Sequence, residues 1–232
     1  MPENVPPTTP PLSAADKSRQ VLLLAARRAF AARGLTGARV DEIARGAGMN
    51  KQMLYHYFGN KEGLYTAVLA DVYAEIRRLE QELDLSRLPA EEAMRRLVGF
   101  SFAFLSENPD FVCILADENA HGGIHLNAGG MVGEMNRPII ELLGATLERG
   151  IADGVFRRGL DPLHIYLSFA GMAFFYFANC HTLSQVFERD LLDPSYVSER
   201  RAHIVDFTLN AVRLREGCAL TGKASQEHQL YG

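Results

Sequence analysis

Two short helices around a tight turn, followed by the start of a third helix, are predicted between residues 36 and 65. Val40, Ile43 and Ala44 recur at the three- and four-residue spacing of one helix face. The glycine-containing run 46–48 then lets the chain turn sharply after that helix. This pattern predicts a helix-turn-helix unit.

The second helix of the unit is expected over residues 51–58, after Asn50, a residue type that caps helix N-termini. Met53, Leu54 and Phe58 can point inward, which leaves a polar face. Such a face suits the major groove of DNA, because Gln can hydrogen-bond base edges and Lys, Tyr and His can reach phosphates. A merely solvated face is the alternative, but the turn, the caps and the lysine opening the next helix favour DNA. The candidate DNA-binding residues are Arg39, Asn50, Lys51, Gln52, Tyr55, His56, Tyr57 and Lys61.

The most specific motifs of this segment are Val40-Asp-Glu-Ile-Ala44, Ala47-Gly-Met-Asn50, Leu54-Tyr-His-Tyr-Phe58, and Asn60-Lys-Glu with Leu64. Together they resemble the N-terminal domain of the TetR family of ligand-responsive transcriptional regulators, over roughly residues 16–69. Family members typically carry Thr or Ser near Ala38, and Thr36 is the expected substitute for that cap. The resemblance implies a homodimeric regulator of double-stranded DNA. It favours a repressor that a small-molecule effector releases from a palindromic operator.

Charge is distributed unevenly along the 232 residues. The formal net charge of −4 alone argues against a nucleic-acid partner, but residues 14–65 carry +5 and the remainder −9. A basic head on an acidic body fits a DNA-binding module joined to a module that does not bind DNA. Cys113, Cys180 and Cys218 form no metal-ligand pair. Without a signal peptide or an apolar run of bilayer length, the protein is expected to be soluble and cytoplasmic, with no membrane partner.

The periodicity predicts an all-α fold of about nine helices in four parts. These are a disordered arm (1–13), a helix-turn-helix DNA-binding domain (14–66), a helical effector-binding and dimerisation domain (67–216) and a flexible tail (217–232). The helix that opens at Lys61 is expected to continue to Leu83, from the head into the body. It is therefore the candidate transmitter between the two.

The helix from Ile165 to Ala178 is apolar nearly all round, so every side of it must be covered. One side can face the core of the body and another a second subunit; a plain core helix is the alternative. In the TetR family the last two long helices of each protomer form a four-helix bundle across a two-fold axis. That arrangement implies a homodimer through helices 162–183 and 194–216 here. The interface is expected to use Phe169, Phe177 or their neighbours on the first of these helices, and residues such as Val205, Leu209 and Val212 on the second.

A pocket for the effector is expected in the same body, because ligand pockets are mostly apolar with a few polar groups. The candidate effector-binding residues are Phe100, Phe104, Glu118, Asn119, His121, Arg137, Phe175, Tyr176 and Asn179. Ordinary core packing is the alternative for each of them. No cofactor is expected, and no metal, because the spacing of Glu118, His121 and His125 matches no known metal site.

Two other functions stay open beside the effector-controlled repressor. One is a DNA-binding regulator without an effector, and the other is a helical enzyme. The chain shows no nucleophile motif, phosphate loop or metal-ligand spacing, so an enzyme is the weaker alternative.

Overall fold

The computed structural model describes residues 13–127 and 131–214, so the expected arm (except Ser13) and the expected tail lie outside the described residues. The described part is helical and confirms the all-α prediction. Its elements are α1 (Ala14–Gly37), α2 (Val40–Gly46), α3 (Lys51–Phe58), α4 (Lys61–Gln81), the 3-10 helix η1 (Leu85–Arg87), α5 (Ala90–Glu107), α6 (Pro109–Ala120), α7 (Ile124–Asn127), α8 (Met131–Ala152), α9 (Pro162–Ala178), α10 (Cys180–Val186) and α11 (Pro194–Val212).

Most long helices begin at a side-chain cap that the sequence indicates. The side chains of Ser13, Asn50, Asn60, Asp161 and Asp193 each accept a hydrogen bond from a backbone N–H of the first turn. The expected cap by Thr36 is wrong: Arg39 occupies the N-cap of α2, and no side chain bonds there.

Two breaks add short helices to the nine expected. The helix expected over 162–183 ends at Asn179, and α10 leaves α9 at 71°. The Asn179 side chain donates to the Phe175 carbonyl (2.9 Å), and such local bonds compete with helix continuation. Gly122 and Gly123 both adopt positive φ and separate α6 from α7.

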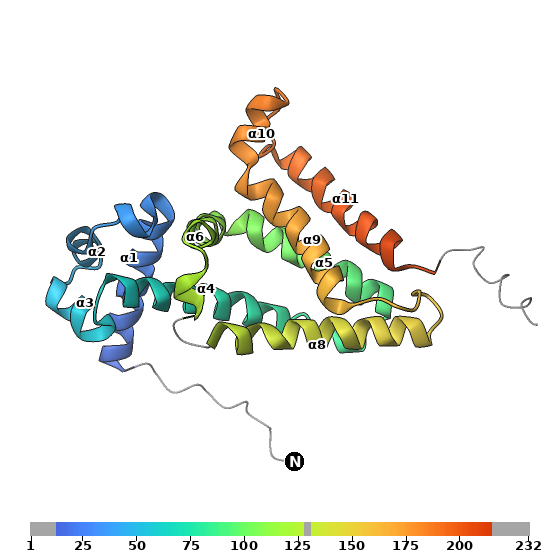
Figure 1. Cartoon of the computed structure of the whole chain (residues 1–232), viewed down its shortest axis with the longest axis horizontal. Coiled ribbons are helices and arrows are strands. Elements are labelled where there is room, and N and C mark those ends of the chain that lie inside the picture. Colours follow the sequence, from blue (N-terminus) through green and yellow to red (C-terminus); the bar gives the residue numbers. More distant parts are fainter. Residues whose placement is uncertain (1–12, 128–130, 215–232) are drawn as a thin grey trace, which may run out of the picture.

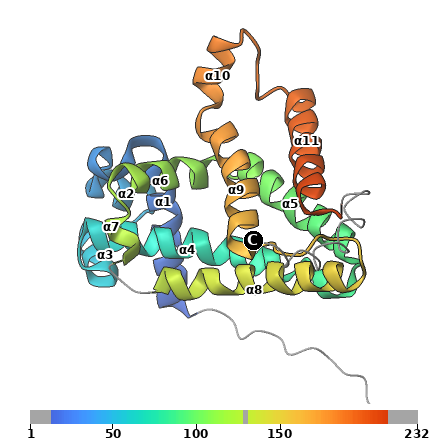
Figure 2. The ribbon, with the colours of Figure 1, turned by 45° about the vertical axis from the view of Figure 1, so that its right-hand side comes forward.

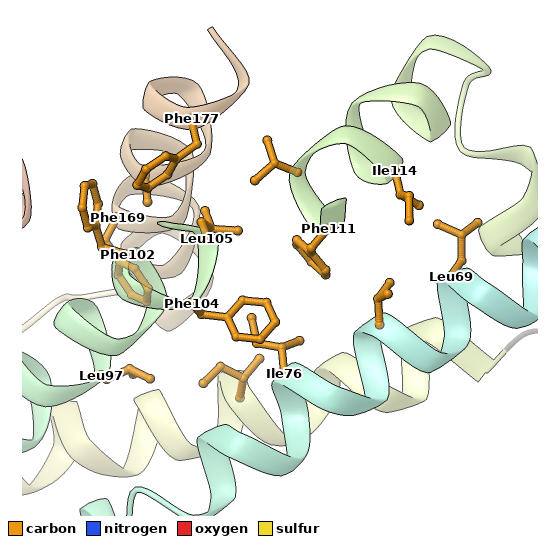
Figure 3. Packing of buried hydrophobic residues seen from close by; sticks show 14 of the residues in the cluster. Leu69, Ile76, Leu97, Phe102, Phe104, Leu105, Phe111, Ile114, Phe169 and Phe177 are labelled. Carbon is orange, nitrogen blue, oxygen red and sulfur yellow. The ribbon is translucent and has the colours of Figure 1, made fainter. Parts of the chain in front are cut away.

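The head consists of α1–α3 and the start of α4, and the remaining helices form the body beside it (Figure 1). Phe30 of α1 packs edge-to-face on Tyr65 of α4, with 5.0 Å between ring centroids. In the body, α4 lies along α8, while α9 and α11 rise from α5 (Figure 2). Phe104, Phe111 and Ile76 bring α5, α6 and α4 together in the core (Figure 3).

Helix α4 passes from the head into the body, with Leu64 buried in the first and Ile76 in the second. The expected division at residues 66 and 67 falls inside this helix and stays a prediction. Within the described residues, no single helix is long and apolar enough to cross a membrane. Two pairs reach that length together, α5 with α6 and α9 with α10, but they are bent by 89° and 71°.

Candidate nucleic-acid interface and internal cavity

The turn between α2 and α3 is built around Gly48, whose φ of 67° lies in the left-handed region that favours glycine. The Met49 N–H donates to the Ala44 carbonyl (2.9 Å) and closes the turn. Leu54 is fully buried and anchors α3 against the head. The opposite side of α3 therefore faces solvent.

Three predicted residues share that solvent side. Gln52, Tyr55 and His56 are exposed at helical spacings of three and four. Lys51 is also exposed, with Nζ 3.3 Å from Asp41 Oδ1, an ion pair that adds little stability at the surface. Exposed Arg39 lies just before α2.

The other three predicted DNA-binding residues have structural contacts. The Asn50 carboxamide oxygen caps α3 by accepting from the Met53 N–H (3.0 Å). Tyr57 is half-buried and packs against the core of the head. Lys61, half-buried at the start of α4, donates from Nζ to the Thr36 carbonyl (3.1 Å) and so ties α4 to the end of α1.

A cavity of about 220 Å³ lies in the body between α4, α5, α6 and α9. Its walls are mostly apolar and aromatic, as in ligand pockets generally. They comprise Tyr73, Ile76, Arg77, Glu80, Ser101, Leu105, Phe111, Leu115, Tyr166, Leu167, Ala170, Gly171 and Phe174. None of the nine predicted effector-binding residues is among them.

Arg77 and Glu80 form a buried ion pair in this cavity, with Arg77 Nη1 2.5 Å from Glu80 Oε2. Burial raises the pKa of Glu80 to about 7, against the smaller lowering effect of Arg77. The sequence did carry a signal for this pair. Tyr73, Ile76, Arg77 and Glu80 recur at helical spacing, so two charged residues continue an apolar stripe.

The predicted effector-binding residues lie in separate places. Phe100 and Phe104 line a groove together with Arg201 of α11, and buried Phe104 also packs on Phe111. Arg137 is exposed on α8. Phe175 is 56% exposed on the outer side of α9, whereas the Tyr176 hydroxyl donates inward to the Leu191 carbonyl (2.5 Å). Asn179 forms the break after α9.

Glu118, Asn119 and His121 lie at the end of α6, where the body meets the head. Buried Glu118 accepts hydrogen bonds from the backbone N–H of His125 (2.8 Å) and that of Leu126, and its Oε2 lies 2.8 Å from His125 Nδ1. The His121 Nδ1 lies 2.7 Å from the Asp117 carbonyl, and Asn119 is exposed. Across 13–127 and 131–214, no group of three or more His, Cys, Asp or Glu could hold a metal ion.

Helix α6 contacts both the cavity and the head. Phe111 and Leu115 line the cavity, while Asp117 Oδ2 accepts from the Leu35 N–H and from the Tyr65 hydroxyl, each at 2.9 Å. Asp110, on the first turn of α6, pairs with Arg27 of α1. A displacement of α6 would therefore alter its contacts with α1 and with the start of α4 in the head.

The five residues named for the dimer interface do not lie on the surface of the single chain, and the interface itself stays a prediction. Phe169, Phe177, Val205, Leu209 and Val212 are all buried inside the single chain, each at most 8% exposed, so their neighbours on the two helices form the surface open to a second copy. Helical spacing indicated that these side chains are covered. It did not indicate whether the same chain or a second copy covers them. The outward apolar residues of the same two helices are Leu163, Leu167 and Phe175 of α9 and Phe207 of α11, 47–56% exposed.

Known protein families match both the head and the body of this chain. Residues 22–68 match the family described as "Bacterial regulatory proteins, tetR family", and residues 90–208 match "Tetracyclin repressor-like, C-terminal domain". The HTH-type transcriptional repressor NicS of Pseudomonas putida is 36% identical over 199 residues, covering 86% of this chain and 94% of that relative.

Solved structures share the fold. The transcriptional regulator SCO4942 from Streptomyces coelicolor is 25% identical, with a TM-score of 0.62 over 84% of this chain and 98% of that one. The ketosteroid transcriptional regulator KstR2 of Mycobacterium tuberculosis is 22% identical, with a TM-score of 0.63 over 85% of this chain and 95% of that one.

Proposed function

Since the chain belongs to the TetR family of transcriptional regulators, we propose that it is a repressor that binds a palindromic operator as a homodimer in the cytoplasm and is released by a small molecule. The exposed face of α3, presented by a glycine turn from a basic head, is the observation that carries the DNA-binding part. The repressor NicS is the relative that supports repression over activation.

On this proposal the eight predicted head residues divide by role. Gln52, Tyr55 and His56 reach the major groove, while Arg39, Lys51 and Lys61 contact phosphates. Lys61 lies where α4 begins, and backbone N–H groups there also favour a phosphate. Asn50 and Tyr57 act by holding α3 in place.

The effector part rests on the cavity beside α4 and α6. Both helices line it, and both contact the head. A ligand that fits one arrangement of these helices better than another shifts the population between the two arrangements, by typically about 1–3 kcal/mol of coupling.

The DNA-binding part is tested by measuring operator affinity with head variants. We expect Lys61→Ala to weaken binding to all sequences alike, and Gln52→Ala to relax preference at one or two base pairs by about 1–3 kcal/mol each. Arg87→Ala is the matched control, because Arg87 is exposed on η1, away from the head.

A double variant gives the clearest outcome. If Tyr55→Ala with Lys61→Ala leaves operator affinity unchanged, α3 and the start of α4 do not face DNA. The enzyme alternative finds no support in a family of regulators.

A further inference from the structure

The guanidinium of Arg77 is only partly satisfied within its cavity. Its Nη1 bonds Glu80, its Nη2 donates to the Tyr166 hydroxyl (3.2 Å), and its Nε has no hydrogen-bond partner in the described part of the chain. The side chain is only 8% exposed, so water from the bulk does not cover this donor. A buried donor without a partner costs roughly 1–3 kcal/mol, and such groups usually have an explanation.

The Nε–Nη2 edge of a guanidinium matches a carboxylate, which accepts two parallel hydrogen bonds from it. In Arg77 only the Tyr166 hydroxyl engages this edge, from the outer helix α9. We propose that the cavity takes a small carboxylate with a planar apolar body, and that Arg77 binds its carboxylate group. This inference rests on the proposal that the cavity is the effector site.

The other walls define the rest of the ligand. Tyr73, Phe111, Tyr166 and Phe174 supply aromatic surface, and the remaining side chains are aliphatic apart from Ser101 and the ion pair. The volume of about 220 Å³ is below the ~300–1,000 Å³ of pockets for drug-sized ligands. A ligand of one ring with one or two substituents fits this space.

Glu80 competes with the ligand for Arg77. Its carboxylate and that of the ligand cannot both be charged beside one guanidinium without repulsion, so binding favours protonated Glu80. The phenols of Tyr73 and Tyr166 and the Ser101 hydroxyl are the other polar groups of the cavity, and Arg77 is the charged partner that acts on Glu80. Because the pKa of Glu80 is about 7, carboxylate affinity falls as pH rises through neutrality.

The test is direct binding of benzoate, benzamide and benzamidine to the full-length protein, by calorimetry without DNA. These probes share one ring and differ in charge. Benzoate is expected to bind best and to lose affinity between about pH 6 and pH 8, although its own carboxyl, with a pKa of about 4, stays ionised there. Preference for benzamidine or benzamide, or no binding of benzoate at millimolar concentration, would overturn the inference.

Variants of the cavity residues test where benzoate binds. Arg77→Gln is expected to reduce benzoate affinity by about tenfold or more, the effect of losing a charged hydrogen bond. The control Arg78→Gln removes the adjacent arginine, which is exposed and paired with Glu82, and leaves affinity unchanged. Glu80→Gln is expected to strengthen binding at pH 8 and to flatten the pH dependence. If Arg77→Gln fails to fold, Ala170→Leu, which fills the cavity, is expected to abolish binding in a stable protein.

Operator release, measured separately, distinguishes this inference from the proposed function. Benzoate binding that needs Arg77 but leaves operator affinity unchanged retains the carboxylate site and removes the effector role. A neutral compound that releases the operator from both wild type and Arg77→Gln, but not from Ala170→Leu, retains the effector cavity and overturns the carboxylate inference.

Discussion

At the scale of single residues, the protonation of Glu80 links stability to pH. Its pKa of about 7 lies above the ordinary carboxyl value because the group is buried. The folded state therefore holds a proton that the unfolded state releases from about pH 4 upward. The stability that this proton provides is complete below the unfolded pKa and is lost as pH rises through about 7.

We expect the free energy of unfolding of the wild type to fall relative to that of Glu80→Gln between about pH 5 and pH 7, at up to about 1.4 kcal/mol per pH unit. Urea denaturation of both proteins across this range measures the difference. Parallel profiles would show that Glu80 titrates normally in the folded protein.

Gly34, in the head, lies very close to Asp117 of the body. Its φ of 66° and ψ of 178° define a conformation that other residues hardly adopt, and a Cβ there would overlap the Asp117 carboxylate. Gly34→Ala is expected to cost about 1–3 kcal/mol in chemical denaturation. Gly46→Ala is the control: nothing lies within 4 Å of a Cβ at Gly46, so helix propensity should stabilise by roughly 0.5–1 kcal/mol. Equal effects of the two substitutions would contradict this close approach.

The caps of α3 and α4 and the turn before α3 were predictable because they depend on neighbours in sequence, whereas the expected cap of α2 by Thr36 was wrong. Asn50 and Asn60 each bond a backbone N–H three residues ahead. The Arg77 and Glu80 pair was not predicted, although both residues lie on a visible stripe. The pair lies in a cavity only because Phe111 and Tyr166, which are distant in sequence, line the same space.

At the scale of elements, α6 is a second candidate transmitter beside α4. Its Asp117 holds the end of α1 and the Tyr65 hydroxyl of α4, and its Phe111 and Leu115 line the cavity. Asp117→Ala would remove the acceptor of the Leu35 N–H, at about 1–3 kcal/mol, and would leave the Tyr65 hydroxyl only its longer bond to the Ile114 carbonyl (3.3 Å).

We expect Asp117→Ala to retain ligand binding and to lose at least half of the change in operator affinity that the ligand causes. Fluorescence anisotropy with labelled operator, with and without ligand, measures that change. Asn119→Ala, an exposed residue on the same helix, is the control and should respond as wild type. A full response in Asp117→Ala would leave α4 as the transmitter.

Helices α9 and α11 show which part of an interface the sequence can predict. Their apolar character was evident, and it indicated that several sides of α9 must be covered. Which side faces a second copy depends on how the body covers the rest. The body covers Phe169 and Leu209, so Phe175 and Phe207 are left outside.

At the scale of the whole molecule, α3 must present itself twice, about one helical turn of DNA or a multiple apart, to read a palindrome. A single chain offers one such helix, so under the proposed function the operator is read by two copies held at fixed spacing. We propose that the outward apolar residues of α9 and α11 make that contact. The two helices lie at the side of the body away from α3 (Figure 1).

Two substitutions on α9 and α11 test this surface. Phe175→Asp with Phe207→Asp replaces two residues that are 56% and 55% exposed, so the single chain should keep its fold while a second copy would have to bury two carboxylates. We expect this variant to sediment as a monomer at micromolar concentration, where the wild type is expected to be a dimer, and to lose most of its operator affinity.

Ile124→Asp, a residue 60% exposed on α7, controls for removal of surface apolar area and should remain dimeric. A dimeric double variant would place the two-fold axis elsewhere, whereas a monomeric variant with full operator affinity would contradict cooperative reading of a palindrome by two α3 helices.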